Sequence, residues 1–199
     1  MKFLLLVILA LSFAGCNNYE KTDNVSSEEN QLQQVASPKP EKTPQTFIVP
    51  GKRLGNIVLD QNFNPILDSL GKPDISNAGM GKAVNTWKHG KNLLTIYTNT
   101  QMGVEDFSRV KAIRSLSNDF KTEDNLGVSS SIDELKRYYR LDPAGKFTDN
   151  GKHYILYKTS KGIAFEVNMK QICNGVLLYS KETNPESFYN AIYPTFEKM

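Results

Sequence analysis

The sequence predicts an α+β fold of two tandem repeats, each a short helix followed by an antiparallel sheet, with a further helix at the C-terminus. Helix-start signals occur at Asn64-Pro65 and again at Ser131. Strand-forming segments follow each of them, and corresponding positions in the two halves lie at nearly constant offsets. We therefore expect repeat 1 over residues 47–117, and repeat 2 with the C-terminal helix over residues 118–199.

The first predicted helix begins at Asn64-Pro65. Asparagine is a favoured N-cap residue, and proline suits the first helical position because its missing N–H would be unpaired there anyway. Gly71 is predicted to end the helix. The apolar residues between these signals are Ile66, Leu67 and Leu70.

The second helix and the C-terminal helix have comparable start signals. Ser131 and Glu134 have the spacing of a capping box. The apolar face that follows is formed by Ile132, Leu135 and Tyr139. Near the C-terminus, Asn184-Pro185 predicts another helix, which Pro194 is expected to end. Its apolar residues are Phe188, Ile192 and Phe196. We expect this helix to pack on the sheet as a lid.

Strand signals follow the first two helices. The predicted strands are residues 85–88, 93–97 and 110–113 in repeat 1, and residues 154–158, 163–167 and 176–179 in repeat 2. Gly127 lies 72 residues after Gly55, and Tyr157 lies 70 residues after Trp87. Such similar offsets favour a duplicated structural unit.

The start of the chain resembles a bacterial secretory signal. Lys2 precedes an apolar run over residues 3–13, which is shorter than the roughly 20 residues that a membrane-spanning helix needs. The run ends in Phe13-Ala14-Gly15-Cys16, which resembles the lipobox, where the cysteine thiol takes a diacylglycerol and the preceding signal peptide, here residues 1–15, is removed. A leucine usually stands where this chain has Phe13. The alternative is an ordinary secretory signal followed by an unmodified Cys16.

Residues 16–46 are predicted to form a disordered tether behind the lipidated cysteine. They are mostly polar or proline, and such a composition cannot bury enough apolar surface to offset the entropy of ordering.

Residues 47–199 carry 20 basic and 16 acidic side chains in a scattered pattern, which excludes a nucleic-acid-binding footprint. We expect a location in the cell envelope. The outer membrane is favoured because Asn17, and not aspartate, follows Cys16.

The pattern also resembles a known group of small envelope proteins. The run Leu70-Gly71-Lys72-Pro73, Trp87 and the apolar strand after it resemble the tandem architecture of the beta-lactamase inhibitor protein and the single unit of the small outer-membrane assembly lipoprotein. The second unit departs from this pattern, since it has Leu141-Asp142-Pro143 in place of the Leu-Gly-x-Pro run. The resemblance implies a protein-binding role with no catalytic residues to transfer.

The sequence contains no recognisable pattern for catalysis, metal binding or a cofactor. His89 and His153 fall in predicted turns and lack partners at metal-ligand spacing. Cys173 is favoured as a small apolar filler over a reactive thiol. The Gly79-Met80-Gly81-Lys82 segment is too short for a phosphate loop and is predicted to be a flexible connection. We therefore expect no cofactor and no enzymatic activity.

Aromatic residues provide the candidate partner surface. They are Trp87, Tyr97, Tyr154, Tyr157 and Phe165. Exposed aromatic side chains often anchor protein interfaces, whereas the alternative is that these residues lie in the core under the helices. The sequence favours a membrane-anchored, non-enzymatic module that binds an envelope protein, either assisting an assembly or restraining an enzyme. The alternative is a ligand-binding or hydrolytic lipoprotein whose site would be a deep pocket formed only in three dimensions.

Overall fold

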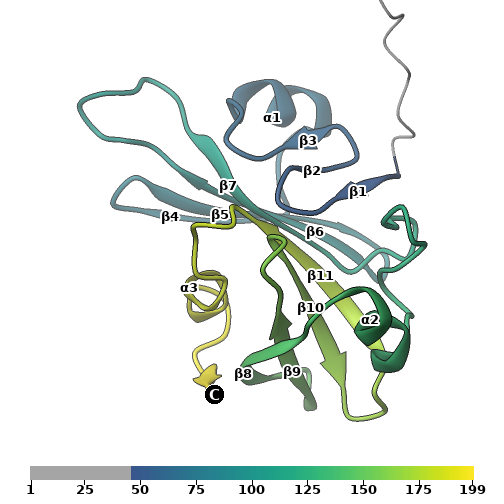
Figure 1. The fold of residues 1–199 in the computed structure, drawn as a ribbon. Helices are drawn as coiled ribbons and strands as arrows, with labels where there is room; N and C mark the ends of the chain where they lie inside the picture. Colours follow the sequence, from purple (N-terminus) through teal and green to yellow (C-terminus); the bar gives the residue numbers. More distant parts are fainter. Residues whose placement is uncertain (1–45) are drawn as a thin grey trace, which may run out of the picture. The chain divides into compact units, whose positions relative to one another are not determined.

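A computed structural model of the chain describes residues 46–199, which form a mostly β structure (Figure 1). The predicted signal peptide, Cys16 and the tether lie outside the described residues. The predicted α+β class with tandem helix repeats is wrong, because the helices are minor elements. Helices α1 (Asn64–Leu70), α2 (Ile132–Tyr138) and α3 (Glu186–Asn190) contain only seven, seven and five residues.

One antiparallel sheet of nine strands dominates the fold, with the strand order β12-β8-β9-β10-β11-β7-β6-β5-β4. Its strands are β4 (Ile75–Gly79), β5 (Lys82–His89), β6 (Asn92–Asn99), β7 (Arg109–Ser115), β8 (Asp142–Asp149), β9 (Lys152–Lys158), β10 (Ile163–Asn168), β11 (Cys173–Tyr179) and β12 (Glu197–Lys198). At its centre β7 pairs with β11, with Ala112 opposite Tyr179. The two segments predicted as separate sheet-bearing repeats therefore share a single sheet.

The helices are short because their neighbouring residues stop them early. Gly71 has a φ of 73° and its N–H bonds to the carbonyl of Leu67, so α1 ends there as predicted. The capping box at Ser131 is confirmed, but the extended backbone at Tyr139 ends α2 and leads toward β8. The C-terminal helix is much shorter than predicted, since α3 already ends at Ala191.

Strands that the sequence did not predict account for much of the difference between the predicted α+β fold and the observed, mostly β fold. The β4 segment lacks alternating apolar residues, and β8 contains Pro143 close to its start. Proline is tolerated in β8 because the pairing with β9 shifts register between Pro143 and Gly145, which is a bulge-like irregularity. The six strands predicted at residues 85–88, 93–97, 110–113, 154–158, 163–167 and 176–179 all lie within observed strands.

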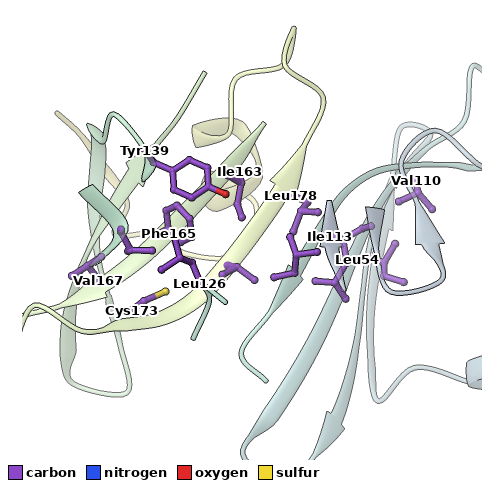
Figure 2. Packing of buried hydrophobic residues seen from close by; sticks show 14 of the residues in the cluster. Leu54, Val110, Ile113, Leu126, Tyr139, Ile163, Phe165, Val167, Cys173 and Leu178 are labelled. Carbon is purple, nitrogen blue, oxygen red and sulfur yellow. The ribbon is translucent and has the colours of Figure 1, made fainter. Parts of the chain in front are cut away.

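One face of the nine-stranded sheet is covered by a small second sheet together with α1 and α2 (Figure 1). The small sheet consists of β1 (Ile48–Val49), β2 (Arg53–Leu54) and β3 (Ile57–Val58). Figure 2 shows the packing, in which Leu54 of the small sheet lies beside Val110 and Ile113 of β7. In the part of the same cluster near β10, the ring of Tyr139 packs against the ring of Phe165. This is the larger of two hydrophobic clusters.

The opposite face is covered by the C-terminal residues. Tyr189 of α3 is fully buried against a second cluster that includes Phe147, Leu156 and Leu177. After α3 the chain continues to β12, which pairs with the edge strand β8. The expected packing of the C-terminal segment on the sheet is therefore observed, although most of the segment is not helical.

Candidate binding surface

The candidate site is a pair of neighbouring turns at one end of the sheet. The turn Met80-Gly81 joins β4 to β5, and residues 100–108 connect β6 to β7. The N–H of Thr100 donates to the carbonyl of Gly81 at 2.7 Å, which holds the two segments together. A Cβ placed on Gly81 would lie 2.7 Å from the carbonyl oxygen of Thr100, so only glycine permits this approach.

Three large apolar side chains stand in solvent on these turns. Met80 is 95% exposed, Met102 is 73% exposed and Val104 is 71% exposed. We call these three residues the tip. Sequence reasoning missed them as a site, since it treated the Met80 segment only as a connection. The available signal was the presence of methionine and valine in turns whose other residues are mostly glycine, polar or acidic.

The base of the longer turn is fixed by polar contacts, so its apolar residues are presented on a defined support. The hydroxyls of Thr100 and Ser108 are 2.7 Å apart across the base. Arg109 donates to Glu105, and its guanidinium lies 4.9 Å from the ring centre of Phe107. The hydrogen bond to Glu105 also raises the pKa of Arg109 above its ordinary value.

Four of the five aromatic residues proposed as a partner surface lie in the core. Trp87, Tyr97, Tyr154 and Phe165 are each at most 6% exposed, and Tyr157 is half-buried. Trp87 donates its indole N–H to the carbonyl of Gly71 and so ties α1 to the sheet. The structure divides the set between the two faces of the sheet, with Tyr97 and Tyr154 on the side of α3. The four buried side chains are thus not available as surface anchors, and Tyr157 is accessible only in part.

A buried ion pair lies under the C-terminal segment. Arg114 of β7 and Glu166 of β10 are 3% and 1% exposed. Arg114 Nη2 donates to Glu166 Oε2 at 2.9 Å and to the hydroxyl of Tyr193 at 2.9 Å, while the hydroxyl of Tyr189 donates to Glu166. Burial alone would lower the pKa of Arg114, but the charge and hydrogen bonds of Glu166 raise it above its ordinary value. The arrangement holds the C-terminal segment on the sheet.

Tyr97 lies in the same cluster, and its buried hydroxyl has no hydrogen-bond partner among the described residues. Burial is the main reason that the pKa of this hydroxyl is raised. Tyr97→Phe removes the unpaired group while keeping the ring, so we expect the free energy of unfolding to rise by about 1 kcal/mol. Urea denaturation measures this change.

Tyr189→Phe is the matched control for that prediction, because its hydroxyl has a charged partner. It should lower the free energy of unfolding by about 2 kcal/mol, since it removes a hydrogen bond to the buried Glu166 carboxylate. A loss of stability in Tyr97→Phe as large as that in Tyr189→Phe would contradict the assignment of an unpaired hydroxyl.

The remaining candidates for chemistry are separated in the fold. Cys173 is 1% exposed, and burial raises the pKa of its thiol, as expected for an apolar filler. His89 and His153 are exposed near strand ends, and His153 Nδ1 lies 3.0 Å from the hydroxyl of Thr148. Within residues 46–199 there is no cluster of three or more His, Cys, Asp or Glu side chains that could hold a metal ion. Within the same range, no helix is long and apolar enough to cross a membrane.

Several hollows on the described part of the chain are open and mainly apolar. One of about 560 Å³ lies over β8 and β9 and includes the ionisable side chains of Lys146, His153 and Glu197 in its lining. A groove of similar volume, about 560 Å³, lies between α1, the small sheet and Phe120. Its lining contains no ionisable side chain, so it offers no group for acid–base chemistry. A smaller pocket of about 270 Å³ lies beside α3, with Tyr97 and Phe188 in its lining and Lys82 and Lys111 among its polar residues. Lys111 already forms an ion pair with Asp60.

Comparison with known proteins assigns no family to the chain. No protein-family model and no curated protein matches it. A cysteine-rich secretory protein from Staphylococcus aureus subsp. aureus Mu50 is similar with a TM-score of 0.41 and 14% identity, over 62% of this chain and 44% of that protein. An extracellular protein containing an SCP domain, from Bacillus anthracis str. Ames, is similar with a TM-score of 0.41 and 7% identity. The match covers 61% of this chain and 44% of that protein. The chain thus spans less than half the length of either.

Proposed function

We propose that the protein is a lipid-anchored, non-enzymatic envelope protein that binds another protein through the tip. The observation that carries this proposal is the exposure of Met80, Met102 and Val104 on two neighbouring turns. Apolar side chains that gather in solvent lose contact with water when a partner covers them, at about 25 cal/mol per Å² of buried area. Methionine suits such a contact because its flexible thioether side chain adapts to the partner.

The envelope location rests on the N-terminal sequence. The lipobox-like run that ends at Cys16 supports attachment to a membrane through a diacylglycerol, and Asn17 favours the outer membrane. The tip would then meet other proteins that are held at, or reach, the same membrane surface. An assembly factor and an inhibitor of an envelope enzyme both fit this arrangement.

Site-specific photo-crosslinking in intact cells tests the tip. A photoreactive amino acid placed at Met102 or Val104 of the full chain should give a discrete covalent adduct with one partner protein. The matched control is Met169, which is 67% exposed in a different turn. The probe at Met169 should give no such adduct, because a single exposed methionine without apolar neighbours on an adjacent turn offers a partner too little apolar surface.

A second set of variants makes the result specific to the tip. With the probe at Met80, the double substitution Met102→Gln and Val104→Gln should reduce the adduct at least about tenfold, equivalent to a loss of about 1.4 kcal/mol in binding. Met169→Gln should leave it unchanged. Equal labelling from Met102 and Met169 would show that the tip is not a specific binding surface.

A further inference from the structure

Strand β4 leaves one edge of the nine-stranded sheet open in the described part of the chain. All five of its residues are exposed, and its pairing with β5 runs without a register shift from Ile75–Thr86 to Gly79–Lys82. A two-residue turn makes the flanking pair Gly79–Lys82 a hydrogen-bonded pair. Because hydrogen-bonded and non-hydrogen-bonded pairs alternate along an antiparallel ladder, the backbone groups of Asn77 and Ile75 also bond to β5. The backbone N–H and C=O groups of Ser76 and Ala78 therefore point outward, away from β5.

The two edges of the sheet differ in their protection. The β8 edge is covered by β12, and Lys146 of β8 pairs with Glu197 of β12 at 2.7 Å. Folded proteins usually protect an open edge with charged residues, proline or a bulge. The residues of β4, which are Ile75, Ser76, Asn77, Ala78 and Gly79, include none of these.

We propose that two copies of this chain pair through β4, antiparallel across a two-fold axis that passes at Asn77. In this register Ser76 lies opposite Ala78 of the partner subunit, and the outward groups of both copies form about four N–H···O bonds. The two nine-stranded sheets become one continuous sheet. The assembly is closed, because a two-fold axis uses the same edge of both subunits.

The side chains of β4 favour a second copy of the chain as the occupant. A strand that pairs with itself places like residues near the axis, so a charged residue there would repel its own copy, and β4 carries no charge. Small side chains meet at Ser76 and Ala78. Ile75, which is 44% exposed, lies opposite Gly79 of the partner subunit, where there is room to cover it. This proposal is independent of partner binding through the tip.

Cysteine crosslinking of the full chain in its own membranes tests the register. Opposed residues of a non-hydrogen-bonded antiparallel pair have Cα atoms roughly 4.5 Å apart, which suits a disulfide. Asn77→Cys should therefore form a covalent dimer of the chain under a mild oxidant. Lys170→Cys, in an exposed turn away from β4, is the control and should remain monomeric. Cys173 does not compete because it is buried.

Two further variants separate pairing from random collision. Ala78→Pro in the Asn77→Cys chain removes one outward N–H and should reduce the dimer at least about tenfold. Ala78→Val keeps the N–H and should leave the amount of covalent dimer unchanged. Thermal melting verifies that both variants are folded. Equal dimer from Asn77→Cys and Lys170→Cys would overturn the proposal. An Asn77→Cys adduct with a different polypeptide would also overturn it, since a foreign strand would then occupy the edge.

Discussion

Replacing Arg114 with methionine should lower the free energy of unfolding by about 3–5 kcal/mol. The variant leaves Glu166 in the core without its cation, and the carboxylate is 1% exposed and cannot turn to water without moving the C-terminal segment. The loss is comparable to a large part of the stability of a typical domain, so the variant should be partly unfolded at elevated temperature. Chemical denaturation of both proteins measures the difference.

The double variant Arg114→Met with Glu166→Leu shows whether the loss comes from an unpaired charge. Replacing both members of a buried ion pair by apolar residues is often neutral or stabilising, so most of the lost stability should return. Tyr189 and Tyr193 then lose their charged partners, which sets a limit on the recovery. A single-variant loss below about 1 kcal/mol would contradict the assignment of a fully buried pair.

Replacing Cys16 with serine should release the protein from membranes or leave its signal uncleaved. Only a thiol can form the thioether to diacylglycerol, and each buried CH₂ of a lipid chain contributes about 0.8 kcal/mol to membrane affinity. The domain carries 20 basic and 16 acidic side chains, and adhesion through so small an excess of charge would be lost in salt. Wild-type protein should stay with membranes through salt and carbonate washes.

Cys173→Ser is the matched control for that experiment, because it removes the other cysteine of the chain. It should keep full membrane retention, and metabolic labelling with a fatty acid should mark this variant and the wild type but not Cys16→Ser. Equal membrane retention of Cys16→Ser and wild type, with no label on either, would show that Phe13 prevents lipidation.

The sequence predicted the central strands because their apolar residues are dense and bounded by turn residues. The hairpin around His89 and Gly90 and the capping box at Ser131 are local signals that depend on a few neighbouring residues. Whether those strands belong to one sheet depends on the β7–β11 pairing, which joins residues far apart in the chain. No local pattern encodes that contact, so the fold class predicted from the elements was wrong.

The candidate site could not be predicted for a related reason. Burial of Tyr97 and Tyr154 depends on the C-terminal segment crossing their face of the sheet, which residue spacing does not show. The tip depends on the approach of Gly81 to Thr100, two residues in different connections. Strand β4 lacks an apolar pattern because all five of its residues face solvent, so its edge became visible only in three dimensions.

The position of the buried ion pair along the chain has a consequence for biogenesis. Arg114 and Glu166 are hydrogen-bonded by Tyr193 and Tyr189, which follow both of them in the sequence. While these tyrosines are still inside the ribosome, the polar groups that they supply are missing from the core. The buried ion pair therefore gains its full set of hydrogen bonds only after residues 189–193 have emerged, so this part of the core forms late during synthesis.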